Sequence, residues 1–286
     1  METSLFVQWG SPVKYNDVSK YRVSWKRLNA NDLLGTVEVS SANSSVNLVN
    51  NLSAAVAYIV TVTSYESSGI NISTSVQQAT KPYKPDGISG SNLDLDNGFL
   101  NITWHYSGTI TGIDIRFIVV LIDSRSSVTI NRTEVTTNYV TFPSTGLKNG
   151  YRYNVSITAR SEEYTSPAGQ KNRVNSDVFI DSFKTTVKAP NPPTYLSCFD
   201  ATDRTITLKW NQPLLPNGDI ILYSIVIKRT QPSQESYNIT SQGMNVQYTV
   251  NGLTAGSFYT FQVYTVNELY TSTSFAEAAS CATKPQ

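Results

Sequence analysis

The residues that most often carry enzyme chemistry are scarce in this chain. Its 286 residues include one histidine, His105, and two cysteines, Cys198 and Cys281, which lie far apart in the sequence. A zinc site needs about four ligands, usually cysteine or histidine, and these three residues do not supply them. Because His105 directly follows Trp104 at the end of a predicted strand, it is interpreted as structural or solvent-facing rather than as a general acid or base. The sequence predicts no catalytic residue, no metal site and no cofactor.

Seven asparagines stand in the Asn-x-Ser/Thr pattern that accepts N-linked glycans. They are Asn43, Asn51, Asn71, Asn101, Asn131, Asn154 and Asn238. Because Asn, Ser and Thr are abundant, chance alone gives nearly as many, so their positions matter more than their number. Asn101 and Asn154 fall on outward positions of predicted strands, and Asn71 falls in a predicted loop. We expect these three to be accessible to solvent.

The elements that position these residues are marked by a spacing that occurs three times. A tryptophan is followed by a leucine 43 positions later, and the leucine by a tyrosine 6 positions later. The copies are Trp9, Leu52 and Tyr58; Trp104, Leu147 and Tyr153; and Trp210, Leu253 and Tyr259. Each tryptophan closes, and each tyrosine opens, a run that alternates between apolar and polar residues, as half-buried strands do. The spacing predicts three all-β modules.

The composition excludes some classes of partner. Charged residues make up 15% of the chain and the net charge is +1, so no basic surface is expected to attract nucleic acid. The longest apolar run, residues 117–122, is far shorter than the roughly 20 residues that cross a bilayer. We expect this segment neither to bind nucleic acid nor to insert into a membrane.

The three modules resemble fibronectin type III domains over nearly the whole chain. The resemblance implies three tandem immunoglobulin-like Greek-key β-sandwiches. It places an aromatic residue of the third strand beside each core tryptophan, and these residues are Tyr21, Phe117 and Tyr223. The Leu-x5-Tyr segments then mark the turn into a late strand, where a buried tyrosine must hydrogen-bond its hydroxyl to nearby backbone. Trp25, on the face of Tyr21, is predicted to be a core residue.

Two proline-rich segments, residues 79–85 and 188–193, predict the domain boundaries. The modules are expected at residues 1–80, 81–188 and 189–286, joined by stiff linkers into a semi-rigid rod. The first module begins directly at its second strand, so it is predicted to lack strand A, and the true N-terminus is expected elsewhere. Residues 282–285 repeat the linker sequence of residues 79–82, which suggests a further module in the parent protein.

The resemblance also places the two cysteines. Cys198 falls in the first strand of the third module and Cys281 in its last strand. Because these strands can lie against each other in such sandwiches, a disulfide is expected. The alternative is a pair of free, buried thiols.

The third strand of the second module carries more apolar residues than the fold requires. Phe117 takes the position of Tyr21 and Tyr223, so Ile118, Val120 and Ile122 are predicted to point outward. An apolar patch of this kind is seldom left bare. Two explanations stay open, namely a contact surface for a protein partner or neighbouring module, and shielding by a glycan on Asn154.

The resemblance implies a non-catalytic, extracellular segment of a cell-surface receptor that binds a protein ligand in adhesion. A narrower resemblance is to the ectodomains of receptor-type protein tyrosine phosphatases, whose catalytic domain is cytoplasmic. The alternatives are passive spacer modules of a matrix or adhesion protein, and accessory modules of a secreted enzyme. Cytokine-receptor modules are excluded, because no module has four cysteines and the chain has no Trp-Ser-x-Trp-Ser motif.

Overall fold

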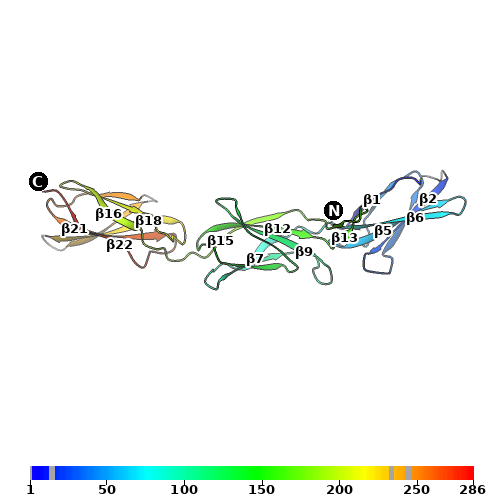
Figure 1. The fold of residues 1–286 in the computed structure, drawn as a ribbon, viewed down its shortest axis with the longest axis horizontal. Helices are drawn as coiled ribbons and strands as arrows, with labels where there is room; N and C mark the ends of the chain where they lie inside the picture. Colours follow the sequence, from blue (N-terminus) through cyan, green and yellow to red (C-terminus); the bar gives the residue numbers. More distant parts are fainter. Residues whose placement is uncertain (1, 13–16, 232–234, 243–245) are drawn as a thin grey trace. The chain divides into compact units, whose positions relative to one another are not determined.

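The alternating sequence folds into strands and turns throughout the part of the chain that the structure describes. The computed structural model describes residues 2–12, 17–231, 235–242 and 246–286, with the backbone alone for residues 89–92, 230–231 and 235–242. Its strands form three β-sandwiches, which can be followed by colour in Figure 1 and which confirm the predicted all-β fold. The chain divides into two compact units, which are described separately. The first is Met1–Asn92, Leu100–Phe142 and Tyr153–Phe183, and the second is Leu93–Phe99, Pro143–Arg152 and Lys184–Gln286.

The first sandwich, in the first unit, has a two-stranded and a four-stranded sheet. The sheets have the strand orders β1 (Leu5–Gln8), β4 (Ser45–Leu48), and β3 (Gly35–Ser40), β2 (Val18–Arg27), β5 (Ala57–Glu66), β6 (Asn71–Ala79). Tyr21 and Trp25 point inward from β2 and are buried. Trp9 packs on Tyr21 with their ring centroids 5.2 Å apart, but it is only half-buried. The reason is that β1 pairs with β4 alone, whereas the strands of Trp104 and Trp210 lie between two neighbours.

The second sandwich lies mostly in the first unit, with its loops Leu93–Phe99 and Pro143–Arg152 in the second. Its sheets have the orders β11 (Tyr139–Pro143), β8 (Phe99–His105), β7 (Asp86–Asn92), and β10 (Thr129–Val135), β9 (Arg116–Asp123), β12 (Arg152–Arg160), β15 (Phe179–Lys184). A short hairpin, β13 (Tyr164–Thr165) and β14 (Lys171–Asn172), follows β12. Trp104 meets Phe117 edge to face, with ring centroids 5.4 Å apart, at the centre of the core.

The third sandwich belongs to the second unit. Its sheets have the orders β16 (Thr194–Ala201), β17 (Ile206–Asn211), β20 (Gln247–Val250), and β19 (Glu235–Gln242), β18 (Ile220–Gln231), β21 (Phe258–Asn267), β22 (Ala276–Ala282). Trp210 and Tyr223 pack edge to face in the core, with ring centroids 5.1 Å apart. A disulfide joins Cys198 on β16 to Cys281 on β22, across a Cα–Cα distance of 6.1 Å. The bridge links the two sheets of this sandwich.

Each Leu-x5-Tyr segment folds as a corner that buries its tyrosine. Tyr58 and Tyr259 accept hydrogen bonds at their hydroxyl oxygens from the backbone N–H groups of Ser53 (2.7 Å) and Thr254 (2.8 Å). Tyr153 is 2% exposed. The corner residues Leu52 and Leu253 are buried as well.

The third corner leucine, Leu147, was predicted to be a core residue but is only half-buried. The amide of Leu253 donates to the carbonyl of Arg204 at 3.0 Å. Arg204 lies in the turn between β16 and β17, so this bond connects the corner to a distant turn of the same sandwich. The amide of Leu147 instead donates to Ser144 within its own turn, at 2.9 Å. The local bond leaves the Leu147 side chain partly open to solvent.

A buried threonine fastens each corner to the end of the last strand of its sandwich. Thr80, Thr185 and Thr283 are at most 4% exposed. The Thr283 hydroxyl accepts a hydrogen bond from the N–H of Ser257 (3.0 Å) and donates to the carbonyl of Thr254 (2.6 Å). The other two hydroxyls repeat these bonds, Thr80 with Val56 and Ser53, and Thr185 with Tyr151 and Lys148. One side chain therefore satisfies a donor and an acceptor at each corner.

Candidate protein-interaction site

The outer face of β9 carries an apolar stripe, defined as Ile118, Val120 and Ile122. Along β9 the inward residues Phe117, Val119 and Leu121 are at most 1% exposed, and the residues between them are half-buried on the other face. The strand therefore has the register that the position of Phe117 indicates. The stripe is nevertheless not bare, since none of its members is fully exposed.

The neighbouring strands explain why the stripe is half-buried. On β10, Arg132 pairs with Val120 and Glu134 with Ile118. On β12, the partners of Ile118, Val120 and Ile122 are Thr158, Ser156 and Asn154. Side chains opposite each other on paired strands have Cβ atoms about 5 Å apart. Polar and charged groups thus flank the stripe on both sides, and Asn154 lies directly beside Ile122.

A further apolar residue, Ile180 on β15, lies on the outer face of this sheet. On β15, Phe183 is buried and packs against Tyr153, with ring centroids 6.1 Å apart. Because side chains alternate along a strand, Ile180 points to the opposite, outer face. It is 65% exposed. The outer face of the sheet β10–β9–β12–β15 therefore combines a half-buried stripe with a freely exposed isoleucine.

A network of ion pairs borders the stripe at the Arg116 end of β9. Glu134 lies 3.1 Å from the Nη1 of Arg160 and 3.6 Å from the Nη1 of Arg116. Asp114 pairs with Arg116 and with Arg173, whose side chain is only 8% exposed. Burial works against the charge of Asp114, but the hydrogen bonds and positive charges of the two arginines outweigh it and lower the pKa of this carboxyl. The two arginines therefore favour the charged form of Asp114, and the ion pairs give the stripe a charged border.

The structure places the predicted glycosylation sites as follows. Asn43, Asn51, Asn71 and Asn101 are exposed, and Asn131 and Asn154 are half-buried. Asn238 lies on β19, but its side chain is outside the described part. Asn71 was predicted to lie in a loop and is instead the first residue of β6. The hairpin has already reversed at Gly69, where φ is 86°, so Asn71 pairs with Tyr65.

Asn51 also has a backbone role. It precedes the corner leucine with φ of 57°, and the equivalent residues Gly146 and Gly252 have φ of 83° and 73°. Glycine and asparagine adopt this left-handed conformation most readily. The Nδ2 of Asn51 donates to the carbonyl of Leu34 at 3.0 Å. The corner geometry alone accounts for asparagine at this position.

In the first unit, polar contacts join the corner of the first sandwich and the first proline-rich segment to the second sandwich. The Glu162 amide donates to the carbonyl of Ala55 at 2.8 Å, and the Glu162 carboxylate accepts from the amide of Ala57 at 2.9 Å. Lys81 pairs with Asp177 at 2.8 Å. Backbone contacts of this kind restrain the linker more than a mobile surface ion pair does.

In the second unit, the other proline-rich segment is held in a similar way. The Nζ of Lys188 lies 2.7 Å from Asp96 and 3.1 Å from Asp94. These hydrogen bonds raise the pKa of Lys188. The Nδ2 of Asn267 donates to the carbonyl of Lys188 at 2.9 Å, and the Nδ2 of Asn217 donates to that of Ala189 at 2.8 Å.

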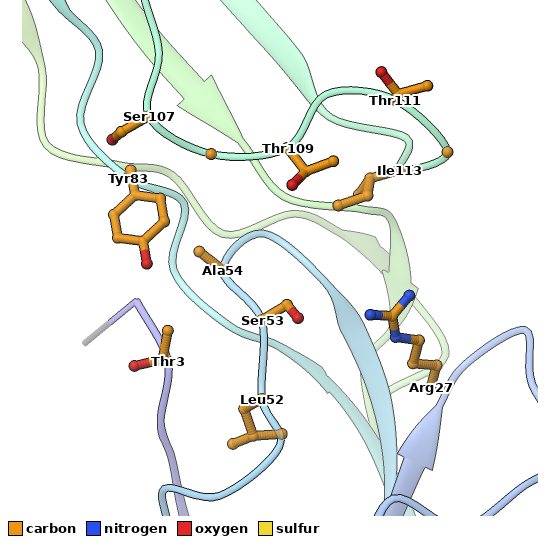
Figure 2. Close-up of a pocket in the computed structure, with 12 residues that line it drawn as sticks. Thr3, Arg27, Leu52, Ser53, Ala54, Tyr83, Ser107, Thr109, Thr111 and Ile113 are labelled. Carbon is orange, nitrogen blue, oxygen red and sulfur yellow. The ribbon is translucent and has the colours of Figure 1, made fainter.

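The first unit also contains a cavity of about 580 Å³, shown in Figure 2. Four segments supply its lining, namely the residues around Thr3, the end of β2, the corner after β4, and the loop between β8 and β9. Tyr83 of the linker adds an aromatic ring. The lining residues are Thr3, Arg27, Leu52, Ser53, Ala54, Tyr83, Ser107, Gly108, Thr109, Thr111, Gly112 and Ile113.

The histidine named in the sequence analysis lies at the surface. His105 makes a contact of 2.6 Å from its Nδ1 to Asp86, and both side chains are more than 60% exposed. No group of three or more His, Cys, Asp or Glu residues with metal-binding geometry occurs among the described residues. None of the described segments forms a helix long and apolar enough to cross a membrane.

Sequence reasoning missed the Arg173 network, the corner threonines and the cavity. The threonines had a visible signal, because Thr80 and Thr283 share the sequence Ala-Thr-Lys-Pro. The cavity had none, since its lining comes from segments between residues 3 and 113 that carry no common pattern.

Comparison with known proteins gives similarities of three kinds. Residues 1–80 and 191–280 match the family described as "Fibronectin type III domain". Titin of Drosophila melanogaster is 28% identical over 213 residues, which are 71% of this chain and 1% of titin. Phosphatidylinositol phosphatase PTPRQ of Homo sapiens is 28% identical over 41% of this chain and 5% of its own length. The solved structure of the FN1-FN3 domains of chicken CNTN1 covers 98% of this chain and is itself covered to 94%, at 13% identity and a TM-score of 0.31.

Proposed function

This chain belongs to the fibronectin type III domain family, and we propose that it is an extracellular segment of a cell-surface receptor that recognises a protein partner in adhesion. Repeats of this family are non-catalytic modules that are typical of adhesion and receptor ectodomains. Because one fold serves many functions, the proposal has to rest on a particular surface of this chain.

The outer face of the sheet β10–β9–β12–β15 is the observation that carries the proposal. Ile118, Val120 and Ile122 form an apolar centre on the same sheet face as the exposed Ile180, which lies two strands away on β15, and an ion-pair network lies at the edge. An apolar centre with a polar, charged rim is the usual composition of a protein interface. This arrangement supports a protein partner rather than a lipid or a nucleic acid.

The contacts of the two linkers support a further part of the proposal. We take the modules to be residues 1–80, 81–188 and 189–286, with each linker held by specific polar bonds in its unit. Such bonds, together with proline-rich sequence, restrict bending at the linkers. We propose that the segment presents its binding face on a semi-rigid array, and that neighbouring modules share in its contacts.

The disulfide supports an extracellular location. Disulfides persist in oxidising compartments and are rare in the cytosol. The exposed sequons Asn43, Asn71 and Asn101 are compatible with glycosylation there. The similarity to PTPRQ supports a receptor-type phosphatase as the parent protein, with catalysis in a separate domain. The chain spans only 5% of that relative, and titin shows the same 28% identity to this chain. The full reading frame of the parent protein is therefore the test of this part of the proposal.

A passive spacer is the alternative function, and one observation favours it. Asn154 pairs directly with Ile122, so a glycan on Asn154 would cover the stripe. In that case the apolar residues would be shielded in the mature protein and would bind no partner.

We predict that the double variant Val120→Thr, Ile122→Lys folds normally but binds cells at least about tenfold more weakly than the unmodified segment. The reason is that the lysine places a charge in the apolar centre of an interface. The measurement is binding of the secreted, fluorescently labelled segment to cells, with thermal melting as the check on folding. The matched control is Ser224→Lys, Val226→Thr on the equivalent outer positions of β18.

The variant Asn154→Gln separates the two functions. If the stripe is a partner surface, removal of this sequon leaves binding unchanged or increases it. Aggregation of Asn154→Gln, together with normal cell binding by the β9 double variant, would instead establish glycan shielding and contradict the proposed interface.

A further inference from the structure

The cavity of Figure 2 has a lining that matches a particular ligand chemistry. Its volume of about 580 Å³ is in the range of small-molecule sites, roughly 300–1,000 Å³. Hydroxyl groups of Thr3, Ser53, Tyr83, Ser107 and Thr109 belong to its lining, as drawn in Figure 2. Each of these hydroxyls can both donate and accept a hydrogen bond. Such a lining fits a ligand that carries many hydroxyl groups of its own.

One charged group lines the cavity among the described residues, and it is a cation. The side chain of Arg27 makes no ion pair with any described residue, whereas Arg22 on the same strand lies 3.0 Å from Glu38. No aspartate or glutamate is part of the described lining. A guanidinium binds a carboxylate through two parallel N–H bonds. The cavity therefore favours a ligand with a single negative charge.

The apolar part of the lining is small and lies at defined positions. In the view of Figure 2, the Tyr83 ring and Arg27 lie on opposite sides of Ser53 and Ala54. Ile113 packs against the core of the first sandwich, and Leu52 is buried in that core. These groups offer a ligand one aromatic ring and an apolar surface that is held in place by the core. The ring face suits the C–H face of a pyranose, and the small apolar area disfavours a mainly hydrophobic ligand.

We propose that this cavity is a binding site for an acidic saccharide, of the class that carries one carboxylate, such as a sialic or uronic acid. Arg27 binds the carboxylate, Tyr83 contacts the sugar ring, and the Ser and Thr hydroxyls exchange hydrogen bonds with the hydroxyls of the sugar. A polysulfated chain fits less well, because it needs several cations and the described lining has one. The site is separate from the β9 face and does not depend on that interface.

The saccharide has two sources, a glycan on a partner and a glycan on this chain. Asn51 directly precedes Leu52 of the lining, so a glycan carried on Asn51 would lie close to the cavity. Protein produced with its N-glycans and protein from which they have been removed enzymatically distinguish the two. If the glycan of the chain fills the cavity, added saccharide binds only after its removal.

The test is titration of the glycan-free segment with sialyllactose, followed by saturation-transfer NMR and calorimetry. We expect saturable binding, and at least about tenfold weaker binding of lactose, which has the same disaccharide without the acid. Arg27→Gln is expected to lose about tenfold or more in affinity, and Arg22→Gln to lose nothing. Thermal melts of both variants control for folding, and Thr109→Val provides a second variant that keeps the charge. No binding, equal binding of lactose, or an equal effect of Arg22→Gln would overturn the proposal.

Discussion

Reduction of the disulfide between Cys198 and Cys281 is expected to destabilise the third sandwich by about 4 kcal/mol. The bridge closes a loop across a sequence separation of 83, and this loop restricts the conformational freedom of the unfolded chain. The double variant Cys198→Ala, Cys281→Ala should lose a similar amount. Native-state hydrogen exchange of the intact segment measures the effect on β21, next to the bridge.

The other sandwiches supply the internal control for this prediction. They contain no cysteine, so the amides of β5 and β12 should exchange at the same rate with and without reductant. An equal loss of protection in all three sandwiches, or no loss on β21, would contradict the structural role of the bridge. Labelling of both cysteines in folded, unreduced protein would show that the bridge does not form.

The second large effect is expected at the corner threonine of the same sandwich. Thr283→Val keeps the shape of the side chain but removes the hydroxyl, which leaves the N–H of Ser257 and the carbonyl of Thr254 without their partner. Ser257 is 1% exposed, so water cannot replace the bond easily. We expect a loss of about 2–3 kcal/mol, since a stranded buried polar group costs roughly 1–3 kcal/mol. Urea denaturation followed by hydrogen exchange gives the value.

Two further variants identify the cause of that loss. Thr283→Ser keeps the hydroxyl and should cost only about 1 kcal/mol for the lost methyl group. Tyr259→Phe removes the acceptor of the Thr254 amide, and because Thr254 is exposed, solvent can compensate in part. A Thr283→Val variant as stable as Thr283→Ser would mean that the hydroxyl does not hold the corner.

Features with a local period could be predicted from the sequence. Alternation fixes which side of a strand faces the core, so the inward positions of Phe117 and Tyr223 followed from the residue pattern. The repeated distances from tryptophan to leucine and tyrosine reflect one fold used three times. The partial exposure of Trp9 and Leu147 depends instead on how many strands flank β1, and on which carbonyl accepts the Leu147 amide.

The candidate sites were harder to predict, because they depend on contacts between distant segments. The sequence indicated that the residues of the stripe share the outer face of β9. Their half-burial is set by Arg132 on β10 and Ser156 on β12, which only strand pairing brings together. Arg173 gave no signal at all. Its role comes from Asp114, a residue 59 positions away in the sequence.

The most direct test of the proposed interface is site-specific photo-crosslinking on living cells. A photoreactive amino acid replaces Ile122 in one sample and Ser224, at an outer position of the third sandwich, in the other. The account predicts a discrete crosslinked protein from position 122, reduced by an excess of unlabelled segment and absent from position 224. Equal crosslinking at both positions, or none at position 122 while the segment still binds to the cells, would show that the β9 face is not the partner surface.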